Sequence, residues 1–331
     1  METKTLAHVE IIQHIVPIKD NKSVEIAQIL GWNVITKKGK YRVGEVIVYI
    51  EVDSELPNRK PFMFMKNKDF KVKTIYLKQL GMISQGLIFK LSDFEEELPT
   101  TIGSDLTNVL GIKRIEDCHV SGLEYQEFTL PYDNKRDTLT RIQSAPGLIA
   151  EGKSKNWSIT EKLDGLYVTY ILYRNGFKRF YIADQKGVLK TWRKNSVYKD
   201  VAKENCVHWR LRKLLRQNKK AKWVAIQCEI VGKGIKENFY ELDKKRLFVF
   251  KYVDNTCLES CCQKGKDSVE KVNLTWVPTI AITKGLEIEE FIAAADGDSL
   301  VGNGIRKGIV LCNDDDISIE VISNKYLLNQ K

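Results

Sequence analysis

The stretch Glu161-Lys162-Leu163-Asp164-Gly165 lies within a strand-like run from Trp157 to Tyr173. Residues two apart on a strand share a face, so Lys162 and Asp164 are predicted to point the same way. A lysine amine held uncharged can attack the α-phosphate of a nucleotide, and a neighbouring acid can reach a sugar hydroxyl or a metal-bound water. Gly165 lets the backbone approach a ligand. The stretch predicts a nucleotidyl-transfer site, although a lysine and an acid at a solvated strand end have the same pattern.

The segments around this stretch predict an α+β unit with mostly antiparallel strands. Further apolar runs are expected to form strands at residues 176–184, 223–231, 246–253 and 308–313. Residues 196–218 have apolar side chains at helical spacing, which predicts a single helix with a basic outer face. That basic face is either simply solvated or a contact for RNA.

The first hundred residues predict a different, smaller unit. Short apolar or alternating runs recur about every ten residues between Gly, Asn and Pro turn signals, which favours a small barrel over a βαβ domain. We expect an OB-like, nucleic-acid-binding barrel at residues 1–110 and a polar connector at 111–150. The second unit then occupies residues 151–331.

Charge and composition limit the class of protein. The 331 residues include 53 Lys and Arg against 43 Asp and Glu, a net charge of +10, which favours a polyanionic partner or simply a basic, soluble surface. No apolar run approaches the ~18 residues of a membrane span, and the first residues lack a secretory leader. The seven cysteines are irregularly spaced and predict reduced thiols. We expect a soluble intracellular monomer without membrane contact, in the cytoplasm first, with the nucleus or an organelle left open as alternatives.

Several segments resemble one family along nearly the whole chain. Residues 161–165 match motif I of the covalent nucleotidyltransferase superfamily, residues 227–232 resemble motif III, and residues 247–250 resemble motif IIIa. Residues 25–32, 43–54, 84–87, 136–143 and 323–328 are similar to other segments of the OB-domain-bearing, Naegleria-type RNA ligase family. In this family the barrel precedes the transferase domain, whereas DNA ligases and mRNA capping enzymes carry theirs after it.

The resemblance implies an OB-like barrel followed by a nucleotidyltransferase domain of ATP-grasp-like antiparallel β architecture. It makes Lys162 the AMP-accepting nucleophile and Phe250 the aromatic that stacks on adenine. The implied nucleotide contacts are Glu161, Asp164, Gly165, Arg141, Arg193, Glu229, Phe250, Val310 and Lys307. The implied ligands of Mg²⁺ or Mn²⁺ are Asp164, Glu229 and Glu320.

The chain departs from the family pattern at three motifs. Cys228 stands where motif III has Gly, Lys307 stands where motif IV has Glu, and Ser318-Ile319-Glu320 stands where motif V has Lys-x-Lys. A lysine cannot coordinate Mg²⁺, and a glutamate repels phosphate unless a metal intervenes. One hypothesis is an exchange in which Lys307 contacts the phosphates and lowers the pKa of the nucleophile, while Glu320 serves the metal.

The implied function is an ATP-dependent RNA ligase for RNA repair. Such an enzyme seals 5′-phosphate and 3′-hydroxyl RNA ends through a lysyl-AMP intermediate and an adenylated RNA end. The alternative is a catalytically impaired pseudo-ligase that binds RNA. Another lysyl-nucleotide enzyme, such as a DNA ligase or guanylyltransferase, is disfavoured by the domain order.

Overall fold

The computed structural model describes residues 5–19, 21–78, 81–115, 120, 122–132, 139–174, 180–190, 196–260, 263–313, 315 and 317–329. The chain divides into two compact units. The first comprises residues 1–117, 142–148 and 327–331, and the second comprises residues 118–141 and 149–326. The domain boundaries expected at residues 110 and 150 remain predictions, because compact units need not coincide with functional domains.

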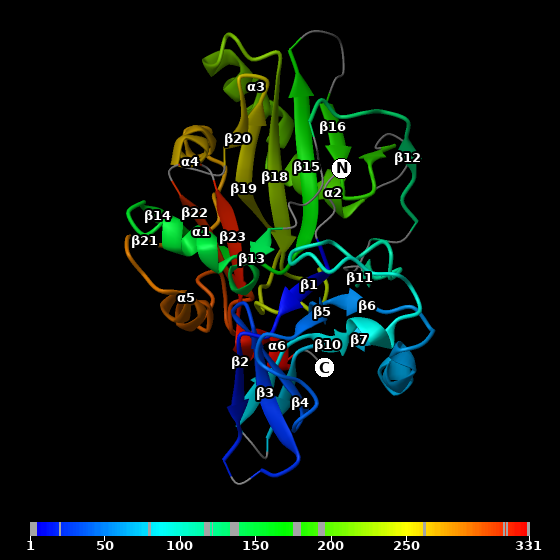
Figure 1. The fold of residues 1–331 in the computed structure, drawn as a ribbon. Coiled ribbons are helices and arrows are strands. Elements are labelled where there is room, and N and C mark those ends of the chain that lie inside the picture. The colour runs from blue at the N-terminus through cyan, green and yellow to red at the C-terminus, as the bar shows by residue number, and fades with distance from the viewer. Residues whose placement is uncertain are drawn as a thin grey trace. The chain divides into compact units, whose positions relative to one another are not determined.

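The first unit is built from short antiparallel strands (Figure 1). Its three-stranded sheets are β1 (Ala7–Ile11), β5 (Val46–Ile50) and β10 (Leu87–Lys90); β2 (His14–Pro17), β3 (Val24–Ile29) and β4 (Trp32–Lys37); and β11 (Lys113–Arg114), β6 (Ser54–Glu55) and β7 (Lys71–Val72). A hairpin of β8 (Ile75–Leu77) and β9 (Met82–Ser84) and the 3₁₀ turns η1 (Phe62–Lys68), η2 (Leu91–Asp93) and η3 (Ile142–Ser144) complete it.

Strand β5 is central because alternate side chains enter two apolar clusters. Val48 and Ile50 pack in one cluster, while Ile47 and Tyr49 pack in the other. Burial on both faces explains why this strand reads as a continuous apolar run rather than an alternating one.

A buried polar network joins residues 142–148 to the strands of the first unit. The Trp32 indole donates to the Ser144 hydroxyl at 3.0 Å, and Ser144 donates to a Glu51 carboxylate oxygen at 2.5 Å. His8 Nδ1 lies 2.9 Å from Glu10 Oε1, and its Nε2 lies 3.8 Å from Glu51 Oε1. Burial alone would lower the pKa of His8, but the Glu10 and Glu51 carboxylates beside the ring raise it to about 9.

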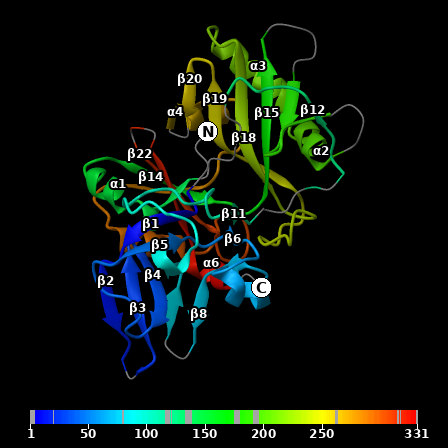
Figure 2. The same ribbon diagram turned by 45° about the vertical axis from the view of Figure 1, so that its right-hand side comes forward.

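The second unit contains two larger sheets, seen from a second direction in Figure 2. The seven-stranded sheet has the order β12 (Tyr125–Gln126), β17 (Val188–Leu189), β16 (Phe180–Ala183), β15 (Leu166–Tyr173), β18 (Trp223–Val231), β19 (Arg246–Asp254), β20 (Cys257–Ser260). The five-stranded sheet has the order β13 (Thr140–Arg141), β23 (Ser318–Ile322), β22 (Gly308–Asn313), β14 (Trp157–Lys162), β21 (Thr279–Thr283). Only the β13–β23 pair among these described strands is parallel.

Helices of the second unit flank these sheets. Helix α3 packs on β15 and β18, α4 packs on β19 and α5 packs on β22 and β23. Among the described residues, the α-helices wholly in the second unit are α2 (Val197–Glu204), α3 (Val207–Gln217), α4 (Gln263–Glu270) and α5 (Ile288–Ala295). Helices α1 (Pro146–Glu151) and α6 (Asn324–Asn329) each include residues of both units. Among the described residues, no helix has the length and apolarity needed to cross a membrane.

Two predicted elements are each divided in the structure. The strand-like run that includes Lys162 forms β14 and β15, which belong to different sheets, and Leu163-Asp164-Gly165 carries the chain from one sheet to the other. The single helix predicted for residues 196–218 is broken between α2 and α3, because Cys206 adopts a left-handed conformation with φ of 47°. Buried residues lie on both sides of this break, at 198, 201 and 202 and again at 207, 211, 214 and 215, and the prediction joined the two groups into one helix.

Candidate active site

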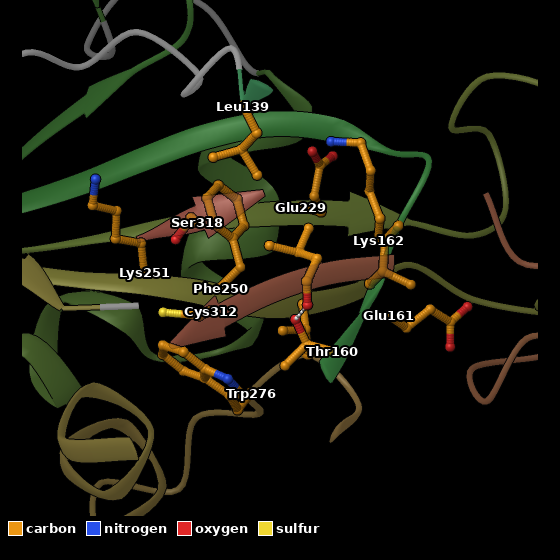
Figure 3. A pocket seen from close by; sticks show the side chains of 13 residues that line it. Leu139, Thr160, Glu161, Lys162, Glu229, Phe250, Lys251, Trp276, Cys312 and Ser318 are labelled. Atoms are coloured by element: carbon orange, nitrogen blue, oxygen red, sulfur yellow. Dashed lines mark hydrogen bonds between the residues drawn. The ribbon is translucent and has the colours of Figure 1, made fainter. Parts of the chain in front are cut away.

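A pocket of about 710 Å³, including its open mouth, lies in the second unit between the two sheets. The lining residues come mainly from β14, β18, β19, β22 and β23: Leu139, Thr160, Glu161, Lys162, Leu163, Glu229, Phe250, Lys251, Trp276, Val277, Val310, Cys312 and Ser318 (Figure 3).

The Lys162 amine is held at this pocket by an ion pair. Its Nζ lies 2.9 Å from Glu320 Oε2, and the two side chains are only 14% and 5% exposed. The strand register explains the contact. Lys162 is opposite Gly308, and Glu320 is opposite Val310 on the next strand, so the lysine crosses a position without a side chain to reach the glutamate diagonally.

Glu161 lines the same pocket, but its carboxylate turns away from the Lys162 amine (Figure 3). Adjacent residues on β14 point to opposite faces of the sheet. The Glu161 carboxylate accepts hydrogen bonds from the Ser299 hydroxyl at 2.6 Å and the Leu300 amide at 2.8 Å. Burial raises the pKa of Glu161. The side chain thus anchors β14 to residues 299–300 from the face opposite Lys162.

Asp164 lies at the centre of a cationic cluster. Its Oδ1 accepts from Lys236 Nζ at 2.6 Å and from Lys307 Nζ at 3.0 Å, and its Oδ2 accepts from the Tyr326 hydroxyl. Burial alone would raise the pKa of Asp164, but the two ammonium groups and the tyrosine hold it well below its usual value. Asp164 is therefore ionised, and Lys307, the motif IV departure, is its direct partner.

Glu229 reaches the pocket from β18. The residue is 4% exposed, and its carboxylate lies on the same side of the pocket as the Lys162 amine (Figure 3). Gly165 makes this packing possible, because a Cβ there would lie 2.4 Å from the Ile230 carbonyl oxygen and 3.0 Å from Glu229 Oε2. The glycine is thus required by the close approach of β15 to β18.

The other end of the pocket is largely apolar. The Phe250 ring projects into the pocket from β19, and the Trp276 indole lies below it in this view (Figure 3). Leu139 and Val310 add aliphatic surface, and Lys251 lies at the far end from Lys162. An apolar, aromatic-lined region beside charged groups fits a ligand with a flat apolar part and an anionic part.

The remaining predicted residues differ in their placement. Arg141 is buried, with Nε 3.7 Å from Glu320 Oε1, because β13 pairs with β23 at this position. It therefore shares Glu320 with Lys162. Arg193 lies outside the described residues.

The predicted metal ligands are three carboxylates that do not form one cluster. Among the described residues, no group of three or more His, Cys, Asp and Glu side chains is arranged to hold a metal ion. Asp164 and Glu320 are ion-paired with lysines, and Glu229 lines the pocket.

Sequence reasoning missed some residues that shape the site. Lys236 and Tyr326 fix Asp164, and Trp276 forms part of the apolar wall. Tyr326 lies within residues 323–328, which resemble the end of the family's sequences, but that resemblance gave it no role. Lys236 and Trp276 have no local sequence signal, because only the fold brings Lys236 to Asp164 and Trp276 to the pocket.

Comparisons with known proteins agree with this architecture. A family model described as an OB-fold domain matches residues 6–91, and one described as RNA ligase matches residues 155–325. These matches confirm the predicted order of an N-terminal OB fold and a second, sheet-dominated domain. No curated protein matches the chain.

Solved structures of Naegleria gruberi RNA ligase superpose on the whole chain at 26% identity. A variant with ATP and Mn has a TM-score of 0.86 and covers 99% of this chain and 99% of that chain. A ligand-free variant also has a TM-score of 0.86, with 100% and 99% covered. The same ligase with PPi has a TM-score of 0.84, with 99% of each chain covered.

Proposed function

Because the chain belongs to the RNA ligase family, we propose that it is an ATP-dependent RNA ligase that joins 5′-phosphate and 3′-hydroxyl RNA ends. The observation that carries this proposal is the position of the Lys162 amine beside Glu229, in a pocket whose other end holds Phe250. Naegleria gruberi RNA ligase has been solved with ATP and Mn and with AMP and Mn, which supports ATP as the nucleotide here.

In the first step, Lys162 Nζ attacks the α-phosphorus of ATP. An N–P bond forms, the bond from the α-phosphorus to the bridging oxygen breaks, and pyrophosphate leaves. The amine must first lose a proton. Glu320 Oε2, at 2.9 Å from Nζ, is within hydrogen-bond reach and is placed to accept it. The glutamate that replaces a motif V lysine thereby acquires a catalytic role.

The nucleotide base binds at the apolar end of the pocket. Phe250 provides a ring on which adenine can stack, and Trp276, Leu139 and Val310 enclose it. Base–aromatic stacking contributes ~1–3 kcal/mol, enough to orient the α-phosphate toward Lys162.

The phosphates meet the cationic cluster around Asp164. Lys236 and Lys307 together bring two positive charges against one carboxylate, which leaves a net positive charge at this corner. Such a charge attracts the β- and γ-phosphates and stabilises the departing pyrophosphate. Lys307 thus supplies the phosphate contact that motif V lysines provide elsewhere in the family.

The carboxylate most suited to a divalent metal is Glu229, because its oxygens are hard ligands and the residue lines the pocket. Mg²⁺ is commonly held by one or two carboxylates together with substrate phosphates, so the lack of a three-residue cluster among the described side chains fits this mode. When bound, Mg²⁺ or Mn²⁺ supplies charge neutralisation at the phosphates.

Two further transfers complete the joining reaction. An RNA 5′-phosphate oxygen attacks the AMP phosphorus, breaking the N–P bond and returning a proton to Lys162. The RNA 3′-hydroxyl then attacks the 5′-phosphate, loses its proton and displaces AMP.

One observation favours a second candidate, a pseudo-ligase that binds RNA without joining it. The Lys162–Glu320 ion pair stabilises the charged amine, which is not nucleophilic. In a ligase Glu320 accepts the proton of Lys162 and leaves a neutral, nucleophilic amine. In a pseudo-ligase Glu320 only balances the charge of the protonated amine.

An RNA-joining assay separates the two. Purified protein is incubated with ATP, Mn²⁺ and nicked RNA carrying either a 5′-phosphate or a 5′-hydroxyl. We expect a sealed product only from the 5′-phosphate and only with an intact Lys162. Lys244→Ala is the control, because Lys244 is exposed and does not line the pocket, and it should leave product formation intact. Binding of both RNAs without sealing would overturn the ligase proposal in favour of the pseudo-ligase.

A further inference from the structure

Helix α3 presents an aromatic and basic face that the proposed chemistry does not use. Trp209, Arg212, Lys213 and Arg216 are spaced at i, i+3, i+4 and i+7, so they share one face, called here the Trp209 face. Trp209 is 54% exposed, and both arginines are exposed. A tryptophan so exposed is unusual, because burying its ring would be favourable.

The opposite face of α3 explains the stability of the helix. Val207, Leu211, Leu214 and Leu215 are buried in the core of the second unit. Arg210 lies between the two faces and donates to the Asn273 carbonyl at 2.5 Å. The helix is therefore anchored without Trp209, so the exposed indole needs another explanation.

The charge of this region is one-sided. Residues 205–228 contain seven Lys and Arg and no Asp or Glu. The preceding helix α2 includes the acids Asp200 and Glu204, so the acid-free stretch begins where α3 does. A cationic surface of this kind attracts phosphate chains by releasing their counterions.

The Trp209 ring is already arranged as half of a stacking site. Lys213 Nζ lies 3.9 Å from the centroid of the indole ring. A cation against one face of an aromatic ring fixes the orientation of that ring. Nucleic-acid-binding proteins that ignore sequence combine such aromatic platforms with cations along the phosphate backbone.

The Trp209 face is separate from the nucleotide pocket. Helix α3 packs on β15 and β18 against side chains such as Tyr170 and Ile226. Glu229, which lines the pocket, directly precedes the core-facing Ile230 on β18. Adjacent strand residues point to opposite faces, so Glu229 points away from α3. RNA bound at α3 therefore contacts a surface other than the one that performs the chemistry.

We infer that the Trp209 face binds single-stranded RNA, with a base stacked on Trp209 and phosphates held by Arg212, Lys213 and Arg216. The inference rests on the proposed function in taking RNA as the substrate, and it adds a second contact away from the ends being joined. An acidic protein segment would also meet the charge, but it would give the exposed indole no flat partner.

The test measures binding of a fluorescein-labelled single-stranded RNA with a 5′-hydroxyl, so that no joining occurs. Trp209→Ala should weaken binding roughly 5- to 150-fold, the effect of losing one stacked base, while Trp209→Phe should retain most of the affinity. Arg212→Ala/Arg216→Ala should reduce the slope of log K against log salt by about 1.4, or ~0.7 per phosphate contact. Lys244→Ala/Lys284→Ala removes two exposed lysines outside α3 and is the matched control, expected to bind as the wild type does.

Other outcomes overturn the inference. Unchanged affinity in Trp209→Ala would exclude stacking, and an equal loss in the lysine control would show only a general charge effect. Equally tight, Trp209-dependent binding of a polyglutamate peptide would make this a site for acidic protein. Joining by the wild-type protein, measured in parallel, tests the proposed function: if the wild type joins RNA while Trp209→Ala binds normally, only the present inference fails.

Discussion

Replacing Glu320 by Gln removes the charge that faces the proposed nucleophile and keeps the shape of the side chain. The wild-type carboxylate lies 2.9 Å from Lys162 Nζ and 3.7 Å from Arg141 Nε, and its side chain is 5% exposed. The variant therefore leaves two buried cations facing a neutral amide, which cannot accept the proton that Lys162 must lose.

Two magnitudes follow from this geometry. General-base catalysis contributes ~10²–10⁴-fold, so the rate of lysyl-AMP formation should fall by that factor while half-saturating ATP changes little. Breaking a buried ion pair costs about 3–5 kcal/mol, and because Gln still hydrogen-bonds, the loss of unfolding free energy should lie near the lower limit.

The assay is a single-turnover measurement of label transfer from α-labelled ATP to the protein across a range of pH. Ser318→Ala, on the same strand and also at the pocket, controls for simple changes of packing. A wild-type rate in Glu320→Gln would refute the proton-acceptor role, and recovery with excess Mn²⁺ would instead favour the metal-ligand role.

Three other predictions concern separate parts of the molecule. Phe250→Ala should raise half-saturating ATP roughly 5- to 150-fold through lost stacking, and an unchanged value in a titration would remove Phe250 from the base site. Tyr326→Phe removes a hydrogen bond to the ionised Asp164 and should lower the unfolding free energy by about 1.5–3 kcal/mol in denaturant titrations. An unchanged unfolding free energy would contradict this contribution. Because the pKa of His8 is raised to about 9, its contribution of about 3 kcal/mol is full below its unfolded pKa of ~6.5 and is lost as pH rises through about 9. Thermal unfolding of the first unit should show this loss in the wild type and not in His8→Gln, and equal pH profiles would contradict it.

Much of the fold was predictable because apolar patterns along the chain are local. The OB fold and the sheet-dominated domain after it follow from short strands, turn residues and motif I, and the family matches confirm both. The change of sheet at residues 163–165 and the break at Cys206 were not predictable. Both depend on the local backbone geometry of a few residues, which the apolar pattern alone does not specify.

The candidate site was predictable at the motifs and not in its pairings. Lys162, Glu229 and Phe250 were named from sequence, and the structure brings them to one pocket. The pairing of Glu320 with Lys162 depends on the register of the strands. Lys307 and Asp164 are far apart in sequence, and only the fold brings them together. The roles of these residues remain predictions until they are measured.

The central claim is that the Lys162 amine bonds to the α-phosphorus of ATP. The most direct test incubates wild-type protein and Lys162→Ala with α-labelled ATP and Mn²⁺ and follows the label on the denatured chain. We expect acid-labile label on the wild type and none on the variant. An unlabelled wild type, or equal label on both, would contradict the claim.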